Sequence, residues 1–236
     1  MFSNNHATTS SGGAISNFST SSLFVYNSTF TGNTENSSTT GGGAILGNGR
    51  VSIYDCTFSN NSSGASRNGG ALYINTSGFA PLISHCTITG NTASNGGGIF
   101  ITPAATAPTI YSSLIADNTT TGTGPDVNGT VFSGDKNLVS RADGSTGFIG
   151  PNDILGTIAS PVDPMIGPLA DNGGLAGITL THKLLTGSPA IDQGDPGLNP
   201  FDERGMPRPV DIPSIPNAGD GSDIGAYEVQ CIPPNT

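Results

Sequence analysis

One short phrase recurs through the first half of the 236-residue sequence at nearly constant spacing. It reads YDCTFSNN at 54–61, with variants at 26–33, 84–91 and 111–118, and FSNN at 2–5 matches its end. The apolar position of the phrase recurs with gaps of 28, 28, 30 and 27 residues, at Phe2, Phe30, Phe58, Ile88 and Ile115. A fixed period of this length is typical of a stack in which each repeat buries its apolar face against its neighbours.

A glycine-rich phrase keeps step with the first one. It reads GGAI at 12–15 and 42–45, GGAL at 69–72 and GGIF at 97–100. Each unit contains short β-type pieces, such as GGAIL, RVSIYD and CTFSN, and no run of helix formers. Propeller blades, at roughly 40 to 50 residues, are too long for this period. The sequence therefore predicts an all-β fold, a right-handed parallel β-helix with three short strands in each coil.

Equivalent residues of such a helix stack, because successive coils lie about 4.8 Å apart. We expect the repeated asparagines to form an amide ladder at a turn, comprising Asn5, Asn33, Asn61, Asn91 and Asn118. The repeated Phe and Ile residues form an internal apolar stack. The paired glycines allow the backbone to turn where a Cβ would clash. The sequence leaves open which residues of the GGAI strand point inward, because GGIF and ALYI suggest opposite answers.

We expect a single domain over 1–236, with regular coils at 1–118 and irregular coils and a closing segment at 119–236. The change is marked by proline: five prolines precede residue 160 and twelve follow it. Since proline cannot donate to a strand ladder, the second part is expected to be loopier and to close one end of the helix. The whole chain predicts roughly eight coils, about 40 Å at the spacing of a sheet.

The net charge of -10 is confined to the second half, since the charges of residues 1–116 cancel. This balance excludes a basic face for nucleic acid and favours a soluble acidic surface, with ion binding as the alternative. No run of about 18 apolar residues predicts a membrane span. The chain carries no signal peptide, but it begins inside a repeat, so trimmed boundaries are favoured over a cytosolic protein.

Two cysteines, Cys56 and Cys86, occupy the same repeat position. A reduced buried pair is favoured over a disulfide, because stacked side chains do not automatically reach disulfide torsions. Cys231 has no partner in this pattern. His85 shares its repeat position with Asn27, Asp55 and Ser112, which indicates a variable, outward-facing, exposed site.

The densest acidic groups follow residue 190. Gly-spaced aspartates can bind calcium, and the candidate ligands are Asp192, Asp195, Asp220 and Asp223, although none matches a full calcium loop. Capping of turns by these side chains is the favoured alternative. Asp202 and Glu203 form a further acidic pair. Arg204 and Arg208 are expected to pair with nearby carboxylates such as Asp223 or Glu228. No other cofactor is expected.

Five phrases of the second half follow one another in order: GPDVNGTVFSGDKNLVS (124–140), DPMIGPLADNGG (163–174), THKLLTGSPAIDQGD (181–195), DERGMPRP (202–209) and DIGAYE (223–228). Over roughly 110–228 they resemble the choice-of-anchor Q domain of bacterial surface proteins. The upstream units are similar to the repeats of chlamydial polymorphic outer-membrane proteins. The resemblance implies an exported right-handed β-helix, held at the cell surface in larger relatives by a C-terminal anchor, and implies no reaction. Only CIPPNT follows DIGAYEVQ here, so an anchor is not expected in this chain.

Two functions are compatible with these patterns. The first is a non-catalytic extracellular or cell-surface protein for structure or adhesion, with end-to-end contacts between copies as a possible mode of assembly. The second is a polysaccharide-active enzyme or a glycan-binding module. Glycoside hydrolysis needs two carboxyl groups facing one groove, and residues 1–116 carry just two carboxylates, neither repeated. Tyr26, Tyr54 and Tyr111 share a repeat position, so a tyrosine row broken by Ser84 is compatible with glycan binding. The sequence predicts that the chain is not an enzyme.

Overall fold

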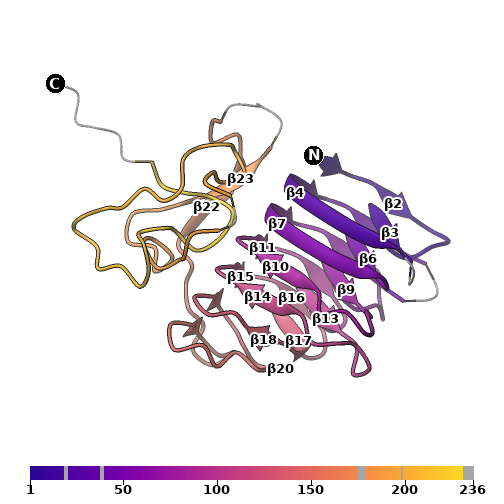
Figure 1. Ribbon diagram of the computed structural model, residues 1–236. Helices are drawn as coiled ribbons and strands as arrows, with labels where there is room; N and C mark the ends of the chain where they lie inside the picture. The colour runs from indigo at the N-terminus through magenta and orange to yellow at the C-terminus, as the bar shows by residue number, and fades with distance from the viewer. Residues whose placement is uncertain (19–20, 38–39, 175–178, 198, 231–236) are drawn as a thin grey trace.

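The computed structural model describes residues 1–18, 21–37, 40–174, 179–197 and 199–230. These residues contain β-strands and no helix, and most of the strands stack into a parallel β-solenoid (Figure 1). The all-β solenoid predicted from the repeat is therefore confirmed. Its N-terminal coils, with β4 and β7, lie at one end, and β17, β18 and β20 lie at the other (Figure 1).

Three parallel sheets form the walls of the solenoid. Sheet A contains β1 (Phe2–Ser3), β4 (Ser22–Thr31), β7 (Arg50–Ser59), β10 (Leu82–Ser84), β11 (Thr87–Thr89), β14 (Thr109–Tyr111), β15 (Leu114–Ala116), β18 (Phe132–Ser133), β19 (Leu138–Val139) and β21 (Ile154–Leu155). Sheet B contains β2 (His6–Ala7), β5 (Thr34–Glu35), β8 (Ser62–Ser63), β12 (Thr92–Ala93) and β16 (Thr119–Thr120). Sheet C contains β3 (Ile15–Asn17), β6 (Ile45–Gly47), β9 (Leu72–Ile74), β13 (Ile99–Ile101), β17 (Val127–Thr130) and β20 (Ser145–Thr146).

The strands within one coil differ from those expected. RVSIYD and CTFS form one continuous strand, β7, and a short strand that was not predicted, β8, follows the turn. Asp55 bends the middle of β7 with φ at 49°, and Asn27, His85 and Ser112 repeat this left-handed bend in the other coils. Asn and Asp tolerate positive φ better than most residues, which suits them to the bend. The bend divides sheet A into two arms. The first arm contains the first halves of β4 and β7 with β10, β14 and β18, and the second arm contains their second halves with β11, β15, β19 and β21.

The solenoid has about five turns, so the expectation of eight coils was wrong. The prediction extended the repeat over the whole chain, whereas residues 163–230, hereafter the C-terminal segment, leave the solenoid. At the usual sheet spacing of about 4.8 Å, five turns span roughly 24 Å instead of 40 Å.

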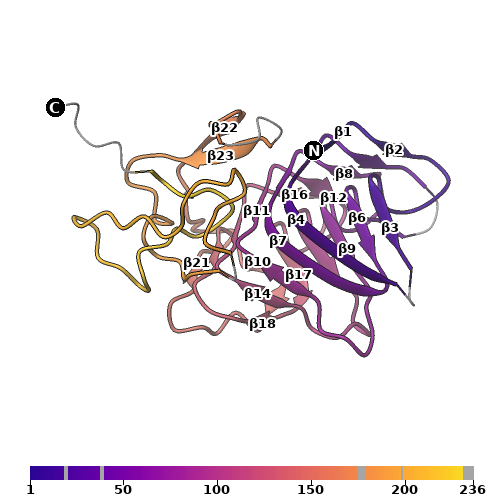
Figure 2. The same ribbon diagram turned by 45° about the horizontal axis from the view of Figure 1, so that its top comes forward.

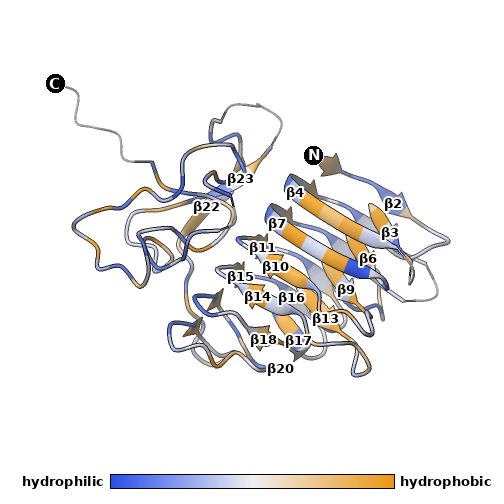
Figure 3. Cartoon of the chain, viewed as in Figure 1, coloured by the Kyte–Doolittle hydropathy of each residue, from blue (hydrophilic) through white to orange (hydrophobic). Residues whose placement is uncertain are grey.

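The core is built from columns of stacked side chains. Phe2, Phe30, Phe58, Ile88 and Ile115 are paired in register, and the rings of Phe30 and Phe58 lie parallel with centroids 4.7 Å apart. Figure 3 shows apolar residues along β4 and β7 of sheet A and on β6 of sheet C. Phe30 and Phe58 are fully buried, whereas Phe2 in the first coil is 38% exposed. Each aromatic ring thus stabilises the coil above and below it.

The pairing within sheet C shows which side chains of the GGAI strand point inward. Ile45, Leu72 and Ile99 are in register and fully buried, so the last residue of GGAI points inward. The equivalent phrase in the fourth coil is therefore GGGI at 96–99 and not GGIF, which explains the conflict seen in the sequence. A Cβ on Gly43 would lie 2.0 Å from the carbonyl oxygen of Gly70, so the close approach of adjacent coils requires glycine there.

The repeated asparagines form a continuous ladder that is buried from Asn33 to Asn118. Oδ1 of Asn61 accepts the backbone N–H of Asn33 at 3.0 Å and its side-chain amide at 2.8 Å, and the same pair of bonds links each coil to the next. The last rung differs, because Asn118 donates both groups to Asp126 at 3.1 and 3.0 Å. A carboxylate accepts without donating, so Asp126 terminates the ladder.

The C-terminal segment packs against the side of the solenoid. It contains the antiparallel pair β22 (Ile166–Ala170) and β23 (Thr181–Leu184), followed by loops. Figures 1 and 2 both show it beside the second arm of sheet A. A second apolar cluster joins Leu114 and Leu138 of that arm to Ile191, Ile224 and Tyr227. The contacts of this part thus lie along sheet A, whereas the sequence led us to expect a segment that closes one end of the helix.

Candidate functional site: a tyrosine groove

A groove of about 400 Å³ lies on the outer face of sheet A, at the bend of the first coils. We call it the tyrosine groove. Its described lining residues are Tyr26, Asn27, Tyr54, Asp55, His85 and Asn199. The first five come from β4, β7 and the turn after β10, while Asn199 comes from the C-terminal segment. The groove thus lies where the edge of the segment meets the solenoid.

The tyrosines form one wall of the groove. Tyr26 and Tyr54 are paired in register, and their rings are stacked with centroids 4.9 Å apart and planes 3° from parallel. Tyr26 is 54% exposed, so its ring edge and hydroxyl are open to solvent. Ser84 and Tyr111 continue this row of sheet A. The hydroxyl of Tyr111 donates to Oδ2 of Asp195 at 2.5 Å, which ties this third tyrosine to the C-terminal segment.

Asp55 forms the floor of the groove and also anchors the C-terminal segment. Its Oδ1 accepts a hydrogen bond from Nη1 of Arg208 at 3.1 Å, and the Asn199 side chain donates a hydrogen bond to the same carboxylate. Burial raises the pKa of Asp55 to about 6, and the Arg208 guanidinium opposes this increase. A carboxyl group with a shifted pKa in a concave aromatic site is a typical feature of a functional site.

His85 is not the exposed residue that the repeat indicated. It is 1% exposed, because the C-terminal segment covers this part of sheet A. Its Nε2 lies 2.7 Å from the carbonyl oxygen of Asp195, and its Nδ1 lies 2.8 Å from Oγ of Ser84. Burial lowers the pKa of His85 to about 3, so the ring is neutral and its two nitrogens are both engaged. His182 is also buried, whereas His6 is exposed.

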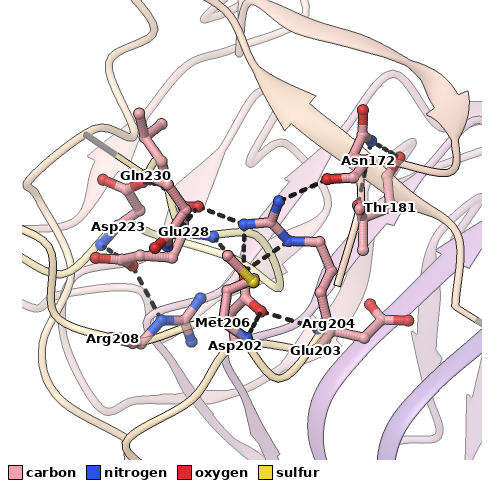
Figure 4. A network of polar contacts seen from close by, with 12 residues as sticks. Asn172, Thr181, Asp202, Glu203, Arg204, Met206, Arg208, Asp223, Glu228 and Gln230 are labelled. Carbon is pink, nitrogen blue, oxygen red and sulfur yellow. Dashed lines mark hydrogen bonds and ion pairs between the residues drawn. The ribbon is translucent and has the colours of Figure 1, made fainter. Parts of the chain in front are cut away.

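Several carboxylates that are far apart in sequence meet beneath the C-terminal segment. Arg208 donates to Glu228 at 3.0 Å as well as to Asp55, and Arg204 donates to Asp202 at 2.6 Å. Figure 4 shows the Arg208–Glu228 and Arg204–Asp202 pairs within one polar network. The expected pairing of Arg208 with Glu228 is present, but Arg204 pairs with Asp202. Part of the acidic excess expected at the surface is therefore buried.

Glu203 connects this network to the solenoid. Its carboxyl oxygens lie 2.9 Å from Oγ1 of Thr29 and 2.5 Å from Oγ1 of Thr57, on neighbouring coils. Burial raises the pKa of Glu203 to about 8. The side chain is fully enclosed and does not line the groove. Its place between two threonine rungs indicates that it fixes the position of the segment along the solenoid axis.

Each of the four candidate calcium ligands accepts a hydrogen bond from the protein or forms an ion pair with it. Asp192 accepts from the backbone of Ile212, Asp195 pairs with Lys136 at 2.7 Å, and Asp220 accepts from the backbone of Ser222. Asp223 accepts the N–H groups of Asp192 and Val229. In the part of the chain that the structure describes, no group of three or more His, Cys, Asp or Glu side chains is arranged to hold a metal ion.

Cys56 and Cys86 are buried free thiols, and burial raises the pKa of both. Cys231 lies outside the described residues.

Only part of the groove could be predicted from the sequence. The tyrosine row could be found from the repeat, but Asn199 follows no period, and nothing in the sequence predicts that Arg208 also pairs with Asp55.

The groove is poor in carboxyl groups. Asp55 is the sole carboxyl group among the described residues that line it. Both hydrolytic mechanisms for glycosides need two carboxyl groups, about 5 to 10 Å apart, on either side of the bond. Of the other carboxylates that the C-terminal segment brings to sheet A, Asp202, Glu203 and Glu228 are buried, whereas Asp195 is partly exposed.

Comparison with family models found one match, to the Chlamydia polymorphic membrane protein repeat, over residues 1–17, 55–75 and 85–102. The matched residues all lie in the regular coils, and the chain is similar to these repeats there. That repeat belongs to surface and outer-membrane proteins, so the match is consistent with a cell-surface β-solenoid. No curated protein and no solved structure matched the chain. None of the described residues forms an apolar helix of the length needed to span a bilayer.

Proposed function

We propose that this protein is a non-catalytic β-solenoid of the cell surface or extracellular space, with a structural or adhesive role. The observation that carries the proposal is the tyrosine groove, whose described lining residues present aromatic rings and amides but a single carboxyl group. Such a surface suits recognition of a ligand better than its chemical conversion.

The repeats and the C-terminal segment support the location. The match to the polymorphic membrane protein repeat covers coils that include β7 to β9. The resemblance of residues 110–228 to the choice-of-anchor Q domain also supports export, because that domain occurs in bacterial surface proteins. Assignment of the chain to this domain family is part of the proposal.

A surface role is tested on intact cells of the source organism. Mild protease treatment of whole cells should remove the protein, whereas a cytoplasmic enzyme in the same sample should survive. Antibodies against the solenoid should also label the cells without permeabilisation. A protein that resists the protease until the cells are lysed would contradict the proposal.

End-to-end assembly remains a prediction. The asparagine ladder cannot continue through the C-terminal end of the solenoid, because Asp126 accepts and has no side-chain amide to donate to another copy. Contact between ends would therefore depend on other groups, such as the exposed ring of Phe2. Light scattering over a concentration series tests this. Growth of the particle with concentration is expected for end-to-end contacts, and a constant monomer mass would exclude them.

The alternative is a polysaccharide-active enzyme that uses Asp55. The observation that favours it is the raised pKa of Asp55, about 6, beside an aromatic wall. A single acid with such a pKa could protonate a leaving group, but a second carboxylate in the groove would be needed to complete hydrolysis.

A further inference from the structure

The tyrosine groove has a hydrogen-bonding capacity that an apolar ligand could not satisfy. Two phenol hydroxyls and two amide side chains line it, together with Asp55. An apolar ligand would leave these groups without water and without partners, at a cost of about 1 to 3 kcal/mol for each buried group. The ligand must therefore both donate and accept hydrogen bonds.

The charges of the groove argue against an anionic ligand. No Lys or Arg is among its described lining residues, and the nearest guanidinium, Arg208, is fully buried. Arg208 is held by Asp55, Glu228 and the carbonyl oxygen of Gly225, so these bonds occupy its donors. A uronate, phosphate or nucleic acid would meet the Asp55 carboxylate, and no Lys or Arg among the described lining residues would pair with the charge of the ligand.

The aromatic wall supplies apolar contact as well as hydrogen-bonding groups. The rings of Tyr26 and Tyr54 are stacked face to face, with centroids 4.9 Å apart and planes 3° from parallel, so they cover each other's facing sides and present their edges and hydroxyls to the groove. A chain of sugars laid along the axis would run across one tyrosine edge per coil, where its C–H groups contact ring carbons and its hydroxyls contact the phenol hydroxyls.

We infer that the tyrosine groove is a binding site for a neutral glycan, whose sugar units contact Tyr26 and Tyr54 and whose hydroxyls bond Asn27, Asn199 and Asp55. This inference rests on the proposed function and specifies its ligand. The groove has a volume of about 400 Å³, which is enough for a short stretch of roughly one to two sugar units.

The inference is tested by calorimetric titration with two groups of probes. The neutral group contains oligosaccharides of β-1,4-glucan, β-1,3-glucan, xylan, mannan and chitin, and the acidic group contains polygalacturonate and alginate. At least one neutral oligosaccharide should bind. Tyr26→Ala should weaken that binding at least about tenfold, which corresponds to about 1.4 kcal/mol of lost contact. Tyr54→Phe, which keeps the ring but not its hydroxyl, should weaken it less.

Tyr73→Ala is the matched control. Tyr73 stacks on Phe100 with centroids 5.3 Å apart, on the outer face of sheet C, and its loss should leave affinity unchanged. Because Tyr26 is exposed, its substitution should keep the fold, which circular dichroism checks. Asn199→Ala on the opposite wall gives a second test.

Three results would overturn the inference: no binding by any neutral probe, binding of the acidic probes alone, or binding unaffected by Tyr26→Ala and Asn199→Ala. The proposed function would survive each of them if the protein is still removed by protease from intact cells. Conversely, a glycan-binding protein that is confined to the cytoplasm would retain the site and refute the surface role.

Discussion

Oγ1 of Thr29 lies 2.9 Å from Oε1 of Glu203 and also 2.9 Å from the carbonyl oxygen of Leu180. A hydroxyl has one proton, so it can donate to just one of these two oxygens. If Thr29 donates to Leu180, the proton between Thr29 and Glu203 belongs to the carboxyl group. This count agrees with the pKa of Glu203, which burial raises to about 8.

The first prediction concerns the stability of the protein between acid and mildly alkaline pH. Because the pKa of Glu203 is higher in the folded state than its ordinary value of 4.5, its contribution is complete below pH 4.5 and is lost as the pH rises from 4.5 to about 8. The melting temperature should therefore fall over this range, and Glu203 should add no further decrease above it.

Glu203→Gln isolates this contribution. The glutamine amide can donate to Thr29 at every pH, so the variant should lose less stability between pH 4.5 and about pH 8 than the wild type. Asp223, whose pKa burial raises to about 8, is present in both proteins and contributes equally to their slopes. Parallel melting curves for the two proteins would show that Glu203 is ionised in the native state.

The contrast between Asn61 and Glu203 shows how far the sequence predicts the structure. Asn61 bonds to residues one repeat away, so its neighbours could be listed from the period alone. Glu203 bonds to Thr57 and Thr29, which lie 146 and 174 residues away, and no repeat relates them. The same covering segment explains His85, whose position is outward but buried. Periodicity therefore predicts contacts between coils and says nothing of a segment that packs on them.

The second prediction concerns the buried ladder. Asn61→Ala removes the acceptor for two donors of Asn33, each worth roughly 1 to 3 kcal/mol when left unsatisfied. The melting temperature should fall on the order of 10 °C. Asn75→Ala is the matched control, because Asn75 donates to Asn48 at 3.1 Å in an exposed ladder where water can replace the bond. Equal melting temperatures for the two variants would contradict the role of burial.

The third prediction concerns the thiols. Cys56 and Cys86 are fully buried, and burial raises their pKa values, so neither should react with a thiol reagent in the native protein. Denaturation should release two further reactive thiols relative to the native state, with or without a reducing agent. An unchanged thiol count after denaturation, restored by reductant, would indicate a disulfide between them.

The central claim is that the groove binds without converting its ligand, and a product assay tests it most directly. The purified protein is incubated with pectin, alginate and the neutral polysaccharides, with and without calcium, and reducing ends and unsaturated sugars are measured. The account predicts no release above a heat-denatured control, because Asp55 is the sole carboxyl group among the described residues that line the groove. Reproducible release of product that Asp55→Asn abolishes would contradict it.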